Sequence, residues 1–182
     1  MNQVGPIKEA KDIQLIKEEL LKKSYRDYLL FLFGINTGIR FSDLINLKFN
    51  QVIKDGKIVP SIQIKKVEYE INKITKECLK VFCSRLPNFS PDDYIFKSRK
   101  GNEPIDRSHA YRIISGAAIR VGINQKVGTQ TLRKTFGYHY YMKYNDVEVL
   151  QKMFNHNSSK QTLDFIGVNF FREEPEKKEL LL

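Results

Sequence analysis

Two arginines of this chain stand at boundaries between predicted elements, where a guanidinium group can meet an anion. Arg40 follows a Thr-Gly-Ile segment at 37–39, and Arg133 lies near the start of a helix predicted over 131–143. An arginine fork and the unpaired N–H groups of a helix N-terminus both favour an anion. Two forks together could hold both non-bridging oxygens of one phosphate, as a phosphoryl transition state requires. Taken alone, surface or salt-bridged arginines are the simpler interpretation.

Helical periodicity supplies most of the elements that must position these arginines. Apolar residues recur at helical spacing over eight segments: 9–23, 25–36, 42–47, 75–85, 107–121, 131–143, 147–154 and 160–166. Hydroxyl or acidic residues precede or begin some of these segments and predict N-caps, namely Ser24, Thr75, Asp106 and Asp146. The segment 25–36 is apolar nearly all round, which predicts a helix in the centre of the core.

Between residues 51 and 74 the apolar period changes from a helical one to a period of two. Strands are predicted over 51–54, 57–59, 61–65 and 69–74, and Asp55-Gly56 is a strong hairpin turn. The predicted fold class is therefore α+β, mainly α-helical with a small antiparallel three-stranded sheet.

The charge of the chain favours a polyanionic partner. It carries 31 Lys+Arg against 21 Asp+Glu, a net charge of +10, among 182 residues that suffice for one domain. Nucleic acid is the first candidate, and a merely solubilising surface is the alternative. No apolar run spans a membrane and no signal peptide starts the chain, so we expect a cytoplasmic protein without membrane contact. Cys78 and Cys83 lie apart from any clustered histidines, which predicts reduced thiols and no metal site.

Four segments, in this order, resemble the characteristic boxes of the tyrosine recombinase (phage integrase) family. They are Thr-Gly-Ile-Arg-Phe-Ser-Asp-Leu at 37–44, Thr-Leu-Arg-Lys-Thr-Phe at 131–136, Leu-Gln-Lys-Met-Phe-Asn-His at 150–156 and Thr-Leu-Asp-Phe-Ile-Gly at 162–167. Order and spacing agree from about Ile7 to Asn169, and the layout of helices, small sheet and helices matches the family's catalytic domain. The resemblance implies a DNA-binding domain for site-specific recombination and DNA integration. Such a domain acts through a covalent phosphotyrosine, without metal or other cofactor.

By this resemblance, Arg40 and Arg133 clamp the scissile phosphate, and His156 forms a hydrogen bond to it. Asp43 matches an acidic position that supports the arginines, and a simple charge at a helix N-terminus is the equal alternative. Lys134, directly after the second arginine, is a further expected DNA contact. Two other histidines match no box and are expected to be structural, namely His109 and His139.

The same resemblance implies a lysine as general acid for the departing 5′ oxygen, carried on the hairpin at 64–69. Lys66 is the first choice, and Lys65, which is also expected to contact DNA, is the second. Lys73 enters the site if the strand register differs, and a solvated strand lysine is the alternative interpretation. Val67-Glu68 stands where a glycine-containing turn is usual in the family.

Two positions depart from the family pattern in residues that carry the chemistry. Gln130 occupies the position of a histidine three residues before Arg133, and its amide can hydrogen-bond but cannot titrate. Phe165 occupies the position of the nucleophilic tyrosine, nine residues after His156, and its ring has no oxygen for a covalent intermediate. The tyrosines of the second arginine helix are expected to pack rather than to replace it: Tyr138, Tyr140, Tyr141 and Tyr144. The sequence therefore predicts a chain that binds DNA and cannot cleave it.

Natural decay explains these departures better than an engineered substitution, which would normally change the nucleophile alone. The predicted organisation is an integrase-like catalytic domain over 1–170 and a charged tail over 171–182, without the N-terminal core-binding domain of the family. Duplex DNA is the expected partner, and the family's tetramers imply a homo-oligomer on DNA. Two other interpretations stay open. One is a non-catalytic remnant that occupies recombination sites or partners an active recombinase, and the other is an unrelated helix-turn-helix protein.

Overall fold

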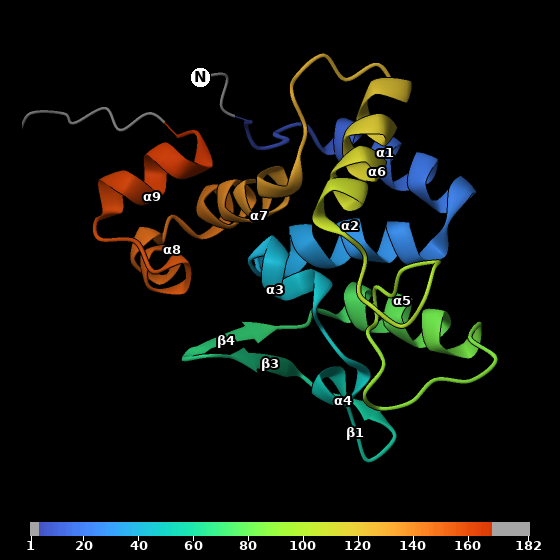
Figure 1. The fold of residues 1–182 in the computed structure, drawn as a ribbon. Coiled ribbons are helices and arrows are strands. Elements are labelled where there is room, and N and C mark those ends of the chain that lie inside the picture. The colour runs from blue at the N-terminus through green and yellow to red at the C-terminus, as the bar shows by residue number, and fades with distance from the viewer. Residues whose placement is uncertain (1–3, 169–182) are drawn as a thin grey trace, which may run out of the picture.

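The computed structural model describes residues 4–168. Within them the helices are α1 Ala10–Lys23, α2 Tyr25–Thr37, α3 Phe41–Ile45, α4 Phe49–Val52, α5 Lys73–Ser84, α6 Arg107–Arg120, α7 Thr129–Tyr144, α8 Val147–Phe154 and α9 Ser159–Ile166 (Figure 1). The strands are β1 Ile53–Lys54, β2 Lys57–Ile58, β3 Ser61–Ile64 and β4 Val67–Glu70. The α+β class with mainly helical content is confirmed. None of the described helices is long and apolar enough to cross a bilayer, and the predicted tail over 171–182 lies outside the described residues.

Helix α2 forms the centre of the main core, as its apolar sequence predicts. The five side chains from Leu29 to Phe33 are each at most 1% exposed, because α1, α5, α6 and α7 pack around the helix. The helix ends at Gly38, whose φ of 67° is a left-handed conformation. A Cβ at this glycine would lie 2.4 Å from the ring of Phe136 on α7. Gly38 thus turns the chain towards Arg40 while α7 lies close to the turn.

The strands form two separate antiparallel hairpins, β1–β2 and β3–β4, rather than one three-stranded sheet. The predicted strand over 51–54 is shortened to β1, because its first two residues end helix α4. The side chain of Gln51 accepts a hydrogen bond from the Lys48 N–H at 2.9 Å, which stabilises the start of this helix. The Asp55-Gly56 turn is confirmed, with φ values of 50° and 71° that suit a tight hairpin.

The β3–β4 hairpin settles the strand register on which the position of the lysines depends. Ile64 pairs with Val67, so Lys65 and Lys66 are the two turn residues, and Lys65 adopts a φ of 57°. Strand β4 therefore begins earlier than the strand predicted over 69–74, at Val67, and also ends earlier, at Glu70.

Helix α5 starts earlier than predicted. The side-chain oxygen of Asn72 accepts a hydrogen bond from the Thr75 N–H at 2.9 Å, so Asn72 is the N-cap in place of Thr75. Lys73 is consequently the first residue of α5 rather than a strand residue. The other predicted N-caps are confirmed, because their side chains accept hydrogen bonds from backbone N–H groups of the first helical turn: Ser24, Asp106 and Asp146.

Helices α7, α8 and α9 enclose a second, smaller core at one end of the molecule (Figure 1). Four of its side chains are at most 3% exposed: Leu150, Phe154, Leu163 and Ile166. Gly137 on α7 permits this packing, because a Cβ there would lie 2.5 Å from the Ile166 side chain and 2.9 Å from the Phe154 ring. Helix α7 therefore joins the main core to the two helices that flank His156 and carry Phe165.

Candidate functional site

The two predicted arginines lie in one cleft of about 480 Å³, formed by the start of α3, the start of α7 and the segment from α8 to α9. Its lining combines cations, amides, hydroxyls and aromatic rings: Arg40, Phe41, Ser42, Arg107, Thr129, Gln130, Arg133, Phe154, Asn155, His156, Gln161 and Phe165. Among these described lining residues none is acidic. The charge of the cleft therefore suits an anion.

Arg133 is held rigidly at the base of the cleft. The residue is only 7% exposed. Its guanidinium donates hydrogen bonds to the carbonyl oxygens of Gly38 and Met153. The bond to the Met153 oxygen measures 3.3 Å, and Cζ lies 4.2 Å from the centroid of the Phe154 ring. Because both terminal nitrogens of the fork donate to carbonyls and the fork also lies near the Phe154 ring, its direction is fixed before any ligand binds.

The charge of Arg133 is opposed by its burial and supported by neighbouring groups. Burial lowers its pKa, and Arg40 acts in the same direction, whereas Tyr69 and Asp43 raise it. An arginine nonetheless stays protonated in proteins. Asp43 lies half-buried on α3 and does not line the cleft, so its effect on Arg133 is electrostatic. The supporting role of Asp43 stays a prediction, and this arrangement agrees with it.

Arg40 is exposed at the N-cap of α3, and its guanidinium donates to the Phe154 carbonyl oxygen at 3.4 Å. The oxygens of Met153 and Phe154 belong to the last turn of α8, where no helical N–H can reach them. Neighbouring carbonyls of one helix end thus hold both arginines. Neither arginine forms an ion pair within residues 4–168. Two arginines without an ion-pair partner in one cleft favour one shared anion.

His156 follows α8 and presents one ring nitrogen to the cleft. Its Nδ1 lies 3.1 Å from the Thr162 hydroxyl oxygen, and that hydroxyl itself donates to the Ser158 carbonyl. In this network Nδ1 carries the proton, so Nε2 of the neutral ring is an acceptor. Burial lowers the pKa of His156, and the charges of Arg133 and Arg40 lower it further. The neutral ring must therefore gain a proton before Nε2 can donate to a phosphate.

Phe165 and Gln130 lie in the cleft at the positions that the sequence predicts. The Phe165 ring on α9 contacts the His156 ring, with centroids 5.1 Å apart, and the Phe154 ring, with centroids 5.5 Å apart. Gln130 is exposed on the first turn of α7, where its amide borders the cleft. The structure therefore brings Gln130 and Phe165 into the same cleft as the arginines, and their assignment to the histidine and tyrosine positions of the family stays a prediction.

The predicted lysines do not line this cleft. Lys65 and Lys66 are exposed at the tip of the β3–β4 hairpin, and Lys73 lies on α5. Lys134 is only 6% exposed and lies with its Nζ 5.1 Å from the centroid of the Phe165 ring. The roles of the hairpin lysines stay predictions, and the burial of Lys134 does not favour the predicted DNA contact.

Arg107 is a lining residue that the sequence interpretation missed. It is the first residue of α6, directly after the N-cap Asp106, and its side chain is exposed at the cleft. The sequence carries the same signal as for Arg133, an arginine near the start of a predicted helix, but the apolar face of the segment 107–121 indicates only packing. For His139 the expected structural role agrees with the contact of its Nε2 with the Ile7 carbonyl at 3.0 Å.

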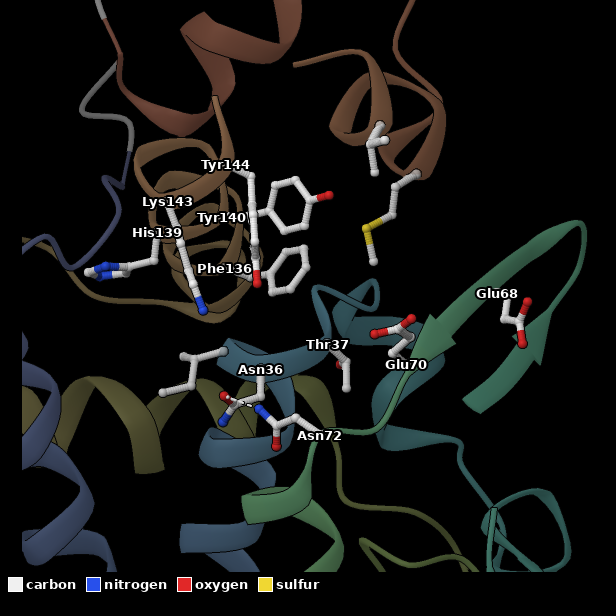
Figure 2. Close-up of a pocket in the computed structure, with 13 residues that line it drawn as sticks. Asn36, Thr37, Glu68, Glu70, Asn72, Phe136, His139, Tyr140, Lys143 and Tyr144 are labelled. Atoms are coloured by element: carbon white, nitrogen blue, oxygen red, sulfur yellow. Dashed lines mark hydrogen bonds between the residues drawn. The ribbon is translucent and has the colours of Figure 1, made fainter. Parts of the chain in front are cut away.

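A second cleft of about 470 Å³ lies between α7 and strand β4 (Figure 2). Figure 2 shows the rings of Phe136 and Tyr140 on α7 across from the carboxylates of Glu68 and Glu70. Its lining contains none of the residues predicted to carry chemistry, and its carboxylates disfavour an anion. We therefore assign the candidate site to the arginine cleft.

Known proteins resemble this chain in sequence and in fold. Residues 8–170 match the model of the phage integrase family. The probable integrase/recombinase YoeC of Bacillus subtilis (strain 168) is 37% identical in an alignment 182 residues long. This alignment covers 93% of this chain and 92% of that protein.

Two solved structures show the same fold at lower identity. The crystal structure of XerA recombinase matches with a TM-score of 0.76 and 21% identity, over 93% of this chain and 62% of that one. The crystal structure of XerH recombinase bound to a palindromic difH substrate matches with a TM-score of 0.71 and 17% identity, over 94% of this chain and 51% of that one. The chain thus spans about half to two thirds of these structural relatives, and nearly all of YoeC. It belongs to the phage integrase family, and its fold is that of a tyrosine recombinase catalytic domain.

Proposed function

We propose that this chain binds duplex DNA as part of site-specific recombination, grips a backbone phosphate in the arginine cleft, and does not cleave the strand. The observation that carries the proposal is the pair of arginines held by the carbonyls at the end of α8, in a cleft without an acidic lining residue among those described. A phosphate diester is the anion that such a pair fits, because each fork can donate to one non-bridging oxygen.

Three further groups support a phosphate at this place. Thr129 and Gln130 in the first turn of α7 line the cleft, so the positive end of this helix faces the same anion. His156 gains a donor at Nε2 when it is protonated, and a bound phosphate favours that protonated form. Arg107 at the start of α6 supplies a third cation at the edge of the cleft.

Cleavage lacks its nucleophile in this chain. A strand can be cut at this site only if an oxygen attacks the phosphorus, and Phe165 places a bare ring where the family places a phenol. Gln130 removes in addition a group that could move a proton, help that is typically worth about 10²–10⁴-fold in rate. The intact grip and the absent nucleophile together favour a chain that occupies recombination sites, alone or beside an active relative.

The organisation of the complex is part of the same proposal. We take residues 1–170 as the integrase-like catalytic domain and expect DNA to be bound by several copies, up to the tetramer known for the family. The XerH recombinase whose structure holds a difH substrate is about twice as long as the part this chain matches.

A binding experiment with one matched control tests the grip. Fluorescence anisotropy would follow a labelled 30-base-pair duplex of random sequence bound by the parent chain, R40A and K80A. Lys80 is an exposed lysine on α5, which does not line the cleft, so K80A removes the same charge elsewhere. Because a charge-assisted hydrogen bond contributes about 1.5–3 kcal/mol, R40A should weaken binding roughly tenfold or more and K80A much less. Equal effects of the two variants would refute a phosphate grip in this cleft.

A further inference from the structure

Lys134 is a buried cation without a conventional partner. The residue is 6% exposed, and within residues 4–168 its ammonium forms neither an ion pair nor a hydrogen bond. Lysines are rarely this deeply buried unless they are paired, and the nitrogen of Lys134 keeps some contact with solvent, because it is not among the fully inaccessible polar atoms. The group that it faces is the ring of Phe165, with Nζ 5.1 Å from the ring centroid.

The packing of α9 on α7 fixes this contact. One turn after Lys134, Gly137 admits the side chain of Ile166, the neighbour of Phe165, at a distance that no Cβ would allow. The ring at position 165 consequently contacts both the Lys134 ammonium on α7 and the His156 ring. A cation over a ring face is favourable for phenylalanine and more so for an electron-rich phenol.

The charged groups around position 165 are mostly cationic. The cations Arg40 and Arg133 come from the cleft side together with the neutral ring of His156, and the cation Lys134 comes from α7. On α9 itself Asp164 is paired with Lys160 at 2.8 Å, and both are exposed. At the end of α9, Lys8 donates to the Gly167 carbonyl at 3.2 Å. The field at position 165 therefore favours negative charge, although Phe165 has no group to carry it.

We propose that Lys134 is a positioning residue for position 165, whose ammonium over the aromatic ring holds the ring there and stabilises negative charge on an oxygen attached to that ring. The inference rests on the proposed function in one respect, the assignment of position 165 as the nucleophile position. The cations around position 165 thus favour a phenolate there, although the residue at this position is phenylalanine. A phenolic oxygen would lie roughly 6 Å from Nζ, so Lys134 acts through its field rather than through a hydrogen bond.

Titration of a single reporter phenol tests this without DNA. 3-Nitrotyrosine placed at position 165 absorbs in the visible range as its phenolate and titrates where the protein is folded. The titration would be compared in the parent background, K134M and K134R, with far-ultraviolet circular dichroism to confirm the fold. At an effective dielectric of about 20–40, loss of the ammonium should raise the titration midpoint by roughly 1–2 pH units, and K134R should restore most of the shift.

The outcomes separate this role from packing alone. An unchanged midpoint in folded K134M would overturn the inference, and so would a rise of the same size in K134R. If K134M does not fold, the comparison of the parent background with K134R decides, since a merely steric role predicts different midpoints for two residues of different shape. Because no DNA is present, a negative result here leaves the anisotropy test of the proposed function unaffected.

Discussion

Replacing Arg133 by lysine separates its structural role from its role in binding. The variant R133K keeps one positive charge but loses the planar fork that donates to the carbonyls of Gly38 and Met153 and lies on the Phe154 ring. A lysine ammonium is a point charge without the planar spread of the fork, so we expect it to leave one of these two carbonyls unsatisfied. An unsatisfied buried carbonyl costs about 1–3 kcal/mol, and part of the contact with the ring is lost as well. We expect R133K to lower the free energy of unfolding by about 2–3 kcal/mol, measured by urea denaturation.

The matched variant is R40K. Arg40 is exposed, and its one hydrogen bond, to the Phe154 carbonyl, is long at 3.4 Å, so R40K should change stability by less than about 0.5 kcal/mol. Both variants should bind the 30-base-pair duplex roughly tenfold or more weakly, since a lysine ammonium lacks the directed donors with which each fork reaches its non-bridging oxygen. The dependence of affinity on salt should stay nearly unchanged, because neither variant alters the charge. Equal losses of stability in R133K and R40K would refute the conclusion that Arg133 is held by buried contacts and Arg40 is not. Unaltered DNA affinity in both variants would refute a phosphate shared by the two arginines.

Three further predictions follow from particular contacts. G137A should destabilise the chain by about 1–3 kcal/mol in urea denaturation, because its Cβ meets Ile166 at 2.5 Å, whereas G116A, whose Cβ would meet only the end of the Arg120 side chain at 3.1 Å, should be neutral or stabilising. A destabilised G116A with a normal G137A would contradict this packing. The pKa of His156 is lowered in the free chain by burial and two arginines, and a bound phosphate raises it, so DNA affinity should increase as pH falls below about 6.5 and H156Q should abolish that increase. An equal pH dependence in H156Q, measured by anisotropy, would exclude His156 as its source. N72A should destabilise α5 by about 1 kcal/mol through loss of its N-cap, and T75A should leave the cap intact.

Much of the site was predictable because it depends on residues close to element boundaries. Arg40, Arg133, His156 and Phe165 lie in four segments whose order and spacing were recognisable, and all four line one cleft. Their convergence depends on the turn at Gly38 and on the packing around Gly137, which bring distant segments together.

Other features were not predictable from the local pattern. The strand predicted over 51–54 lost its first half to α4, because the side chain of Gln51 caps the helix start, a local bond that apolar periodicity does not report. The N-cap of α5 moved to Asn72 for the same kind of reason. Lys134 follows Arg133 directly in sequence, yet the turn of the helix points it towards α9 rather than towards the predicted DNA contact. Which face of α7 would be covered by α9 was set by tertiary packing alone.

The most direct test of the central claim is covalent trapping on DNA. A pool of nicked duplexes of random sequence would be incubated with the parent chain, F165Y and F165Y/Q130H, and each mixture would be run on a denaturing gel. The account predicts retention of DNA by the parent chain in native gels, no covalent adduct from it, and an adduct only from variants with a tyrosine at position 165. An adduct formed by the parent chain would contradict the account, as would a folded F165Y/Q130H variant that binds the duplexes and forms none.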